Sequence, residues 1–248
     1  MEHLLRATAL AESRHFWFRG FRYFVTPLLR QAARGLSEIR LLDCGCGTGA
    51  NLGLLGQFGR VYGLDLSVVG LQIGRAAGRR RLVRASVARV PFASNAFDIV
   101  TSFDVLYSLD ARDERAAVAE MHRVTRPGGF ILVNVAAMAS LTGDHSVLSR
   151  EVRRYSRQSL SRLLTEAGFR ILRLTYTNAT LVAPMLAARA FQRWRGLPPE
   201  ERADTEIKVP PTAVNTLLTA LLRAESWWLR YADNPFGSSL LCLARKEP

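Results

Sequence analysis

Cysteine is scarce in this chain, and the places of its few cysteines limit what they can do. Only Cys44, Cys46 and Cys242 occur in 248 residues. Cys44 and Cys46 are too close in the chain for a favourable disulfide. No Cys-x-x-Cys pair and no cluster of cysteine with histidine is present in the sequence, so a zinc site of that kind is not expected. These features predict a reducing, cytoplasmic setting and no metal.

Long hydrophobic runs are also missing. No stretch reaches the roughly 18 uncharged apolar residues that a membrane span needs. The N-terminal segment contains Glu2 and Glu12 and has no continuous apolar core, so we do not expect a signal peptide.

Negative charge is in short supply, and the excess of positive charge is almost entirely arginine. The chain has 34 lysine and arginine residues against 21 aspartate and glutamate residues, a formal net charge of +13, and its lysines are Lys208 and Lys246. Such a balance can attract nucleic acid, a membrane surface or a phosphorylated substrate. It can equally be a solvated arginine-rich surface.

The segment 15–24 leaves a related choice open, because it mixes aromatic residues with Arg19 and Arg22. One interpretation is a helix that packs on the main domain or covers its cofactor pocket. The other is a basic amphipathic surface that touches lipid. Peripheral membrane contact therefore stays among the expected partners.

The stretch from Leu41 to Asn51 is the feature around which the chain is organised. A short apolar run ends at Asp43, and glycines follow at positions 45, 47 and 49. Glycine has no Cβ atom, so the backbone here can turn tightly and lie against a flat ligand. A nucleoside-type cofactor is therefore expected over the carboxyl end of the first strand of a sheet.

Apolar runs alternate with helix-like segments along most of the chain. The expected strands are 39–44, 60–65, 82–85, 97–103, 130–135, 169–177 and 236–244. Helices are expected over much of 1–37 and over 49–58, 67–77, 112–124, 156–167, 181–194 and 211–231. The alternation predicts an α/β fold with a doubly wound, mostly parallel sheet.

Two carboxylates favour S-adenosylmethionine over a nicotinamide dinucleotide. The glycines and Ala50 can be fitted to the dinucleotide fingerprint, but that signal is weak. Asp43 would lie close to an anionic pyrophosphate, whereas it suits a ligand with an ammonium group. Asp65, about 20 residues later at the end of the next strand, can accept hydrogen bonds from both ribose hydroxyls of either cofactor.

Four segments in combination resemble the class I S-adenosylmethionine-dependent methyltransferases, in the small-molecule branch that includes quinone-biosynthesis enzymes. They are Leu41-Leu42-Asp43-Cys44-Gly45-Cys46-Gly47-Thr48-Gly49, the run 61–67, the run 90–100 and the run 123–129. The resemblance covers about 39–136. It implies a Rossmann-like sheet of seven strands, mostly parallel with an antiparallel last strand, and an enzyme that uses S-adenosyl-L-methionine. It places the cofactor-binding residues at Asp43, Gly45, Gly47, Gly49, Asp65, Leu66, Ser86, Val87 and Phe103.

One position departs from the family pattern. Members usually have an acidic residue where this chain has Ser86, and that acid accepts a hydrogen bond from the adenine amino group. A serine hydroxyl accepts more weakly than a carboxylate, while Val87 can still offer its backbone N–H. We therefore expect S-adenosylmethionine to bind with lower affinity.

The acceptor side is expected in residues 137–248. This part is similar, more loosely, to a subgroup often encoded with sugar- and lipid-modifying enzymes. Methyl transfer from a sulfonium needs a base only if the acceptor must lose a proton. His145, in a polar loop near the expected pocket mouth, is the candidate base, and Tyr107 is the candidate that orients the acceptor. Each can instead be structural, as can Asp104.

The sequence predicts a single domain with three parts. These are an N-terminal helical segment (1–37), a cofactor-binding core (38–136), and an acceptor-side loop, helical cap and final strands (137–248). The expected activity is methyl transfer to a small molecule, at an oxygen of a glycosidic, lipid-linked or secondary-metabolite acceptor. The alternatives are an RNA methyltransferase, although no RNA-binding module is evident, and a methyltransferase-like binding protein without chemistry.

Overall fold

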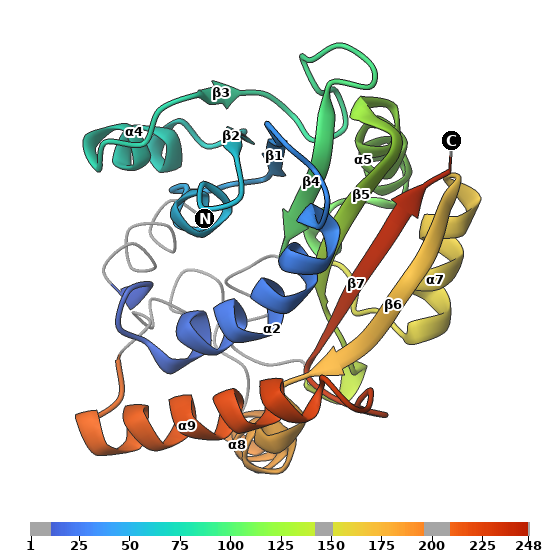
Figure 1. The fold of residues 1–248 in the computed structure, drawn as a ribbon. Helices are drawn as coiled ribbons and strands as arrows, with labels where there is room; N and C mark the ends of the chain where they lie inside the picture. The colour runs from blue at the N-terminus through green and yellow to red at the C-terminus, as the bar shows by residue number, and fades with distance from the viewer. Residues whose placement is uncertain (1–10, 142–150, 196–208, 248) are drawn as a thin grey trace.

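The computed structural model describes residues 11–141, 151–195 and 209–247, and its centre is one twisted sheet (Figure 1). Seven strands follow the order β3-β2-β1-β4-β5-β7-β6. They are β1 (Arg40–Cys44), β2 (Arg60–Asp65), β3 (Leu82–Arg84), β4 (Phe97–Phe103), β5 (Thr125–Ala136), β6 (Phe169–Thr177) and β7 (Ser239–Lys246). Strands β1 to β5 pair in parallel, and β7 is antiparallel to both β5 and β6. The predicted fold class is confirmed.

The central strands explain why the sheet is doubly wound. All seven residues of β4 are buried, and β1 is buried from Leu41 onward. A strand that is apolar on both faces must be covered on both faces. The helices of the chain supply these two layers.

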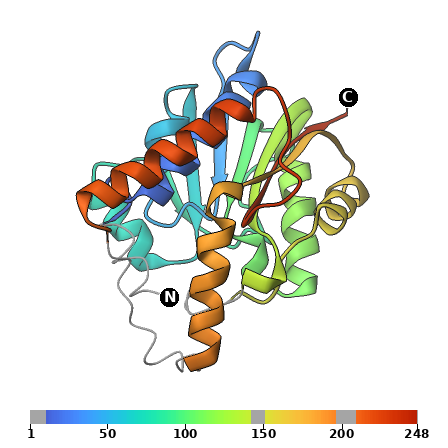
Figure 2. The same ribbon diagram turned by 90° about the horizontal axis from the view of Figure 1, so that it is seen from below.

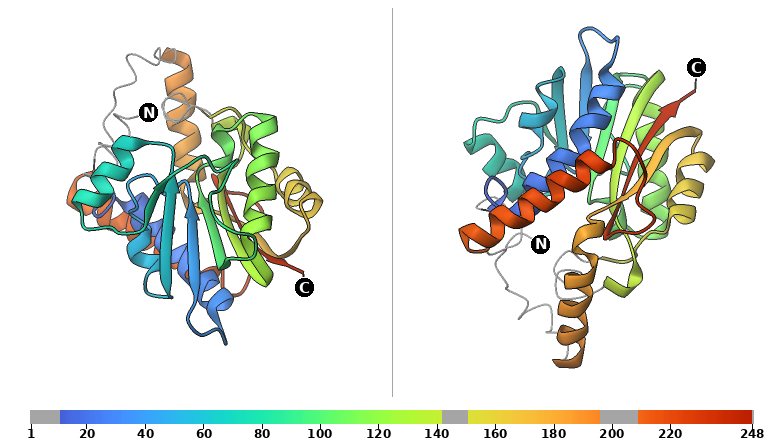
Figure 3. Two further views of the ribbon diagram at one scale, coloured as in Figure 1. Left: turned by 90° about the horizontal axis from the view of Figure 1, so that it is seen from above. Right: turned by 60° about the horizontal axis from the view of Figure 1, so that its bottom comes forward.

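Helices lie on each side of the sheet (Figures 2 and 3). On one face, α2 (Phe16–Ala33), α3 (Leu52–Leu55), α4 (Val68–Ala76) and α9 (Thr212–Trp228) share a core with Leu41, Ile99 and Leu132 of the sheet. On the other face, α5 (Ala111–Val124) and α7 (Arg157–Glu166) share a core with Leu42, Val100 and Val133. The remaining helix, α8 (Val182–Arg195), contacts the 3₁₀ turns η2 (Ala139–Leu141) and η3 (Ala179–Leu181), whereas η1 (Leu106–Ser108) follows β4.

Across 11–141, 151–195 and 209–247, no helix is both long and apolar enough to cross a bilayer.

Helix starts follow their local sequence signals. The Ser67 hydroxyl accepts from the Gly70 N–H at the start of α4, and Asp110 accepts from Arg112 N–H and Asp113 N–H at the start of α5. Ser156 caps α7 in the same way. Each side chain satisfies backbone donors that have no partner within the helix.

The largest difference from the expected boundaries is in β5. The Pro-Gly-Gly turn at 127–129 was expected to precede this strand, which instead begins at Thr125. Thr125 pairs with Phe97, and regular pairing resumes only at Phe130 with Ile99. Gly128 has a φ of +74°, so the turn forms an irregularity inside the strand, as glycine permits.

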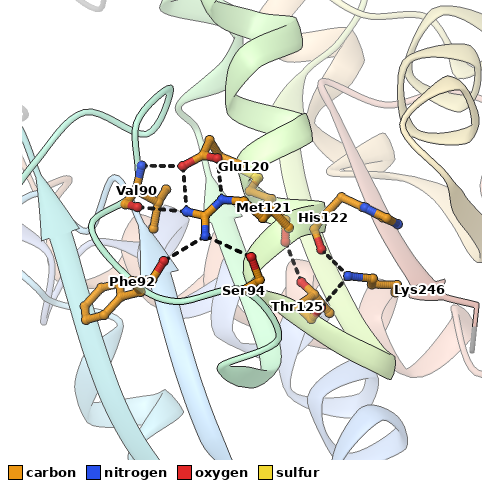
Figure 4. A network of polar contacts seen from close by, with 9 residues as sticks. Val90, Phe92, Ser94, Glu120, Met121, His122, Thr125 and Lys246 are labelled. Atoms are coloured by element: carbon orange, nitrogen blue, oxygen red, sulfur yellow. Dashed lines mark hydrogen bonds and ion pairs between the residues drawn. The ribbon is translucent and has the colours of Figure 1, made fainter.

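A polar network fixes the loop that leads into β4 (Figure 4). Arg123 of α5 donates to the carbonyls of Phe92 (2.8 Å) and Val90 (2.9 Å), and it pairs with Glu120. Glu120 also accepts from the Val90 N–H at 2.7 Å. The Arg123 guanidinium holds the pKa of Glu120 below its ordinary value. Lys246 donates to the carbonyls of His122 and Thr125, where α5 ends.

Helices α2 and α9 lie side by side and run in the same direction (Figures 1 and 2). At their start, the Asn215 side chain accepts from the Phe16 N–H at 2.8 Å and donates to the Arg14 carbonyl at 2.8 Å. Further along, Leu222 packs on the backbone of Gly20: a Cβ atom at Gly20 would lie 2.2 Å from Leu222 Cδ1. This contact of a leucine side chain with a glycine determines how closely the two helices approach.

Leu222→Ala should therefore destabilise the protein strongly. Leu222 is completely buried, and truncating a buried leucine costs about 2–5 kcal/mol of unfolding free energy. Leu217→Ala on the same helix is the matched control, because Leu217 is 61% exposed; its effect should stay within about 0.5 kcal/mol. Urea unfolding of both variants measures this, and equal effects would show that α9 is not held through Leu222.

Candidate functional site

The glycine turn after β1 folds over the end of β2. The Leu64 carbonyl accepts from the N–H groups of both Gly45 (2.8 Å) and Cys46 (2.9 Å). Gly45, Gly47 and Gly49 have φ values of +81°, +54° and +79°. L-residues with a Cβ atom rarely adopt the angles of Gly45 and Gly49, so the backbone itself favours glycine at these two positions.

The loop after β4 packs directly on this turn. A Cβ atom at Gly45 would lie 2.3 Å from Val105 Cγ2, a distance that would force the loop away. The carboxyl ends of β1, β2 and β4 are thereby held together, which is where ligands bind in open parallel sheets.

Asp65 bridges the glycine turn and the start of α4. One carboxylate oxygen accepts from the Gly47 N–H at 2.7 Å and the other from the Ser67 N–H at 2.8 Å. Each oxygen keeps a further lone pair, and the residue is partly exposed. The side chain can therefore shape the turn and still accept from a pair of ligand hydroxyls.

Asp43 is a buried carboxylate at the end of β1. It is 2% exposed, and it accepts from the Thr101 hydroxyl at 2.6 Å. Among the ion pairs of the described residues, none involves Asp43. Burial, with a further contribution from the charge of Asp65, raises the pKa of Asp43 to about 7. A carboxylate in this position favours a cationic ligand, because a nearby positive charge would stabilise its ionised form.

The N-terminal segment contacts the same turn. Glu12, which is buried, accepts from the Thr48 hydroxyl at 3.0 Å and pairs with Arg79 at 3.2 Å. Arg79 also donates to the Thr48 carbonyl at 2.5 Å. Residues from two distant parts of the chain therefore immobilise Thr48. Sequence reasoning missed this group, because nothing local to Glu12 indicates its partners.

The residues expected around the adenine are not all brought together. Leu66 is 60% exposed beside Asp65, where its side chain can cover a ligand. The Ser86 hydroxyl already accepts from the Ala88 N–H at 3.1 Å. Val87 belongs to the core on the α5 face, whereas Phe103 belongs to the core on the α2 face, where its ring contacts Phe21. Phe103 and Val87 therefore approach the site from opposite sides of the sheet.

The acceptor-side candidates are placed only in part. His145 lies outside the described residues. Tyr107 is 6% exposed in η1, and its carbonyl accepts from the N–H groups of Val152 (2.9 Å) and Arg153 (3.3 Å). Tyr155 bridges to Ala137 and donates to Glu114, which also pairs with Arg153. The chain on both sides of 142–150 is thus anchored near the end of β5.

Known proteins match this chain across the same region. A family described as "Methyltransferase domain" matches residues 42–133. A protein of Encephalitozoon cuniculi named as a methyltransferase is 32% identical over 155 residues, which cover 54% of this chain and 72% of that relative. The chain belongs to the class I S-adenosylmethionine-dependent methyltransferases. It is an enzyme of this family, and S-adenosylmethionine is its cofactor.

Other relatives of this methyltransferase share only part of their length with it. Demethylmenaquinone methyltransferase of Geobacillus kaustophilus is 35% identical over 42% of this chain and 48% of its own. Malonyl-[acyl-carrier protein] O-methyltransferase of Serratia marcescens is 38% identical over 41% of this chain and 40% of its own. This chain thus spans less than half the length of both enzymes.

A solved structure extends the comparison of folds to the whole methyltransferase. The S-adenosylmethionine-dependent methyltransferase of Thermotoga maritima has a TM-score of 0.60 at 17% identity, with all of both chains covered. At this identity the likeness shows the fold alone.

The residues present fit the cofactor chemically. S-adenosylmethionine has a cationic methionine end and a ribose with two hydroxyls. The buried carboxylate of Asp43 matches positive charge, and the remaining lone pairs of Asp65 match the two hydroxyls. The positive-φ turn between them has no side chains at its glycines, so a ligand can lie against its backbone.

Asp65→Asn should weaken S-adenosylmethionine binding at least about tenfold, because a hydrogen bond to a charged group contributes about 1.5–3 kcal/mol. The amide also turns a donor toward one of the two backbone N–H groups. Asp110→Asn is the matched control, since Asp110 likewise accepts two backbone N–H bonds at a helix start. Calorimetric titration measures both. An unchanged affinity for Asp65→Asn would remove this residue from the ribose site.

Asp43→Asn should stabilise the free protein at alkaline pH. The pKa of Asp43 is 3.8 in the unfolded chain and about 7 in the folded protein. At a pH between these two values, the folded protein keeps a proton on Asp43 that the unfolded chain has released. Its unfolding free energy therefore falls as pH rises through this range. The unfolding free energy of the variant, relative to that of the natural protein, should therefore rise by about 2 kcal/mol from pH 5 to pH 8.

Urea unfolding at the two pH values tests this expectation, and the same variant should bind S-adenosylmethionine more weakly. A stability difference that does not change with pH would show that the Asp43 charge is not the cause.

Proposed function

We propose that this methyltransferase methylates an oxygen of a small-molecule acceptor that is glycosidic, lipid-linked or a secondary metabolite. The supporting observation is a pair of carboxylates, Asp43 and Asp65, at the carboxyl ends of β1 and β2. These strands are neighbours in the sheet and pair in parallel, with Asp43 opposite Gly63. The two carboxylates suit a cationic nucleoside cofactor. The curated relatives add that acceptors of this family include demethylmenaquinone and a malonyl group on a carrier protein.

Within this proposal, the cofactor is held by the residues around the glycine turn. Asp43 binds the cationic methionine end, Asp65 the ribose, and Leu66, Ser86, Val87 and Phe103 line the adenine and the inner part of the site. Gly45, Gly47 and Gly49 allow the backbone to approach. S-adenosylmethionine supplies a methyl group on a sulfonium whose leaving group is neutral, so alignment and exclusion of water are the main tasks of the chain.

His145 is the proposed general base, and Tyr107 is proposed to orient the acceptor. An alcohol or phenol must lose its proton as the new bond to carbon forms, and an imidazole titrates in the required range. In support of this proposal, the described segments before and after 142–150 are anchored near the end of β5. The chain is proposed to be a single domain in which 38–136 bind cofactor and 137–248 bind acceptor.

RNA is the second candidate, because the net charge of +13 suits a polyanion. A labelling experiment separates the two. The protein is incubated with S-adenosylmethionine labelled in its methyl group and, separately, with an isoprenoid quinol, a lipid-linked glycan preparation and total RNA. We expect label in one of the first two and none that ribonuclease releases. Label in RNA would refute the proposed acceptor class.

The same assay tests His145. Removing a general base lowers turnover about 10²–10⁴-fold, so His145→Ala should do so while S-adenosylmethionine affinity stays unchanged. His122→Gln is the control, because His122 lies in the last turn of α5 against Phe169. Equal turnover in both variants would show that no base acts from position 145.

A further inference from the structure

Helix α9 exposes a continuous apolar face. Val214, Leu217, Leu221 and Trp228 follow one another at helical spacing, and their side chains are 46%, 61%, 39% and 53% exposed. Exposed Ala213, Ala220 and Ala224 lie beside them on the helix, Trp227 lies in its last turn, and Tyr231 follows just after the helix end. We name this set of nine residues the α9 stripe. Scattered exposed apolar residues are ordinary, whereas a contiguous patch marks an interaction surface.

The α9 stripe lies outside both cores of the described residues. The opposite side of the helix makes its internal contacts through buried Asn215, Leu222 and Glu225. Glu225 accepts from the N–H groups of Ala179 and Thr180 and from the Asn234 amide. The polar groups of α9 that face inward are therefore satisfied without the stripe.

Arginines border the stripe on the side of α2. Arg223 is exposed on α9 and Arg230 just after its end, and the Arg223 guanidinium lies over the Tyr23 ring of α2 at 6.0 Å. Helix α2 adds Arg19, Arg22 and Arg30 and contains no acidic residue. The one acidic residue of α9 is Glu225, which is buried and bonded internally. The border is thus purely cationic.

We propose that the α9 stripe and its arginine border dock on the surface of an anionic lipid bilayer. An apolar helical face beside a basic edge is the arrangement that lies in the plane of a membrane interface. Tryptophan and tyrosine, both present in the stripe, prefer that depth. Arginines next to it gain attraction from anionic headgroups.

A second copy of the chain fits this surface less well. Two copies that paired through the stripe would bring their cationic borders together, and the net charge of each chain is +13. Anionic headgroups supply the opposite sign. The proposal concerns where the protein works and does not depend on the acceptor or on the atom that is methylated.

Vesicle flotation of the full chain tests the proposal. Vesicles of phosphatidylcholine alone are compared with vesicles that contain phosphatidylglycerol, at low and at physiological salt. We expect binding to the anionic vesicles only, weakened by salt because exposed charges are screened. Leu217→Ser should reduce the bound fraction about tenfold, which corresponds to losing one buried leucine side chain. Val152→Ser is the matched control, since Val152 is also 61% exposed but lies between β5 and α7.

Arg230→Gln tests the border separately, and it should lower binding to anionic vesicles several-fold without changing the melting temperature. The sedimentation behaviour of the natural chain and of Leu217→Ser is measured without lipid. A dimer that Leu217→Ser dissociates, with no flotation of either protein, would overturn the proposal in favour of self-association. Equal flotation of Leu217→Ser and Val152→Ser would overturn it as well.

Discussion

The carboxylate of Asp65 is the constraint on which the cofactor side of this protein depends. Its two oxygens hold the Gly47 N–H and the Ser67 N–H, and so connect the turn after β1 to the helix after β2. The Leu64 carbonyl and Val105 complete the same junction from β2 and from the loop after β4. The side chain that is proposed to bind the ribose thereby also determines the shape of the glycine turn.

Asp43 shows a conflict between stability and function at the neighbouring strand. Its burial disfavours the ionised form, and the Thr101 hydroxyl compensates only in part. A cationic cofactor would stabilise the ionised form of Asp43 that burial disfavours. Ligand binding and folding are therefore linked through this carboxylate. Functional sites commonly contain buried charged groups with perturbed pKa values, although their burial lowers the stability of the fold.

The sequence predicts those features that depend on local pattern. Strand β4 and strand β6 have the expected boundaries because apolar runs of that length have few alternatives. The caps at Ser67 and Ser156 follow from hydroxyl chemistry within a few residues. Helix α3, by contrast, is shorter than expected and covers only Leu52–Leu55, since Gly49 keeps a positive φ and the chain turns again at Gly56.

The sequence predicts the candidate site residues that lie next to the glycines and not those that come from distant parts of the chain. Asp43 and Asp65 are candidates because they lie at the ends of consecutive strands. Thr101, Val105 and Glu12 act on the same turn from 36 to 60 residues away. Their roles arise from packing between elements, for which a single sequence carries no periodic signal.

The contact between Glu12 and the glycine turn connects residue 12 to the proposed cofactor site. Without Glu12, the Arg79 guanidinium would still donate to the Thr48 carbonyl but would lose the carboxylate that neutralises it. A positive charge would then stand uncompensated beside a turn that is proposed to receive a cation. Shortening this enzyme to the start of α2, a common step before crystallisation or fusion to another protein, would therefore change the charge beside this turn as well as the length of the chain.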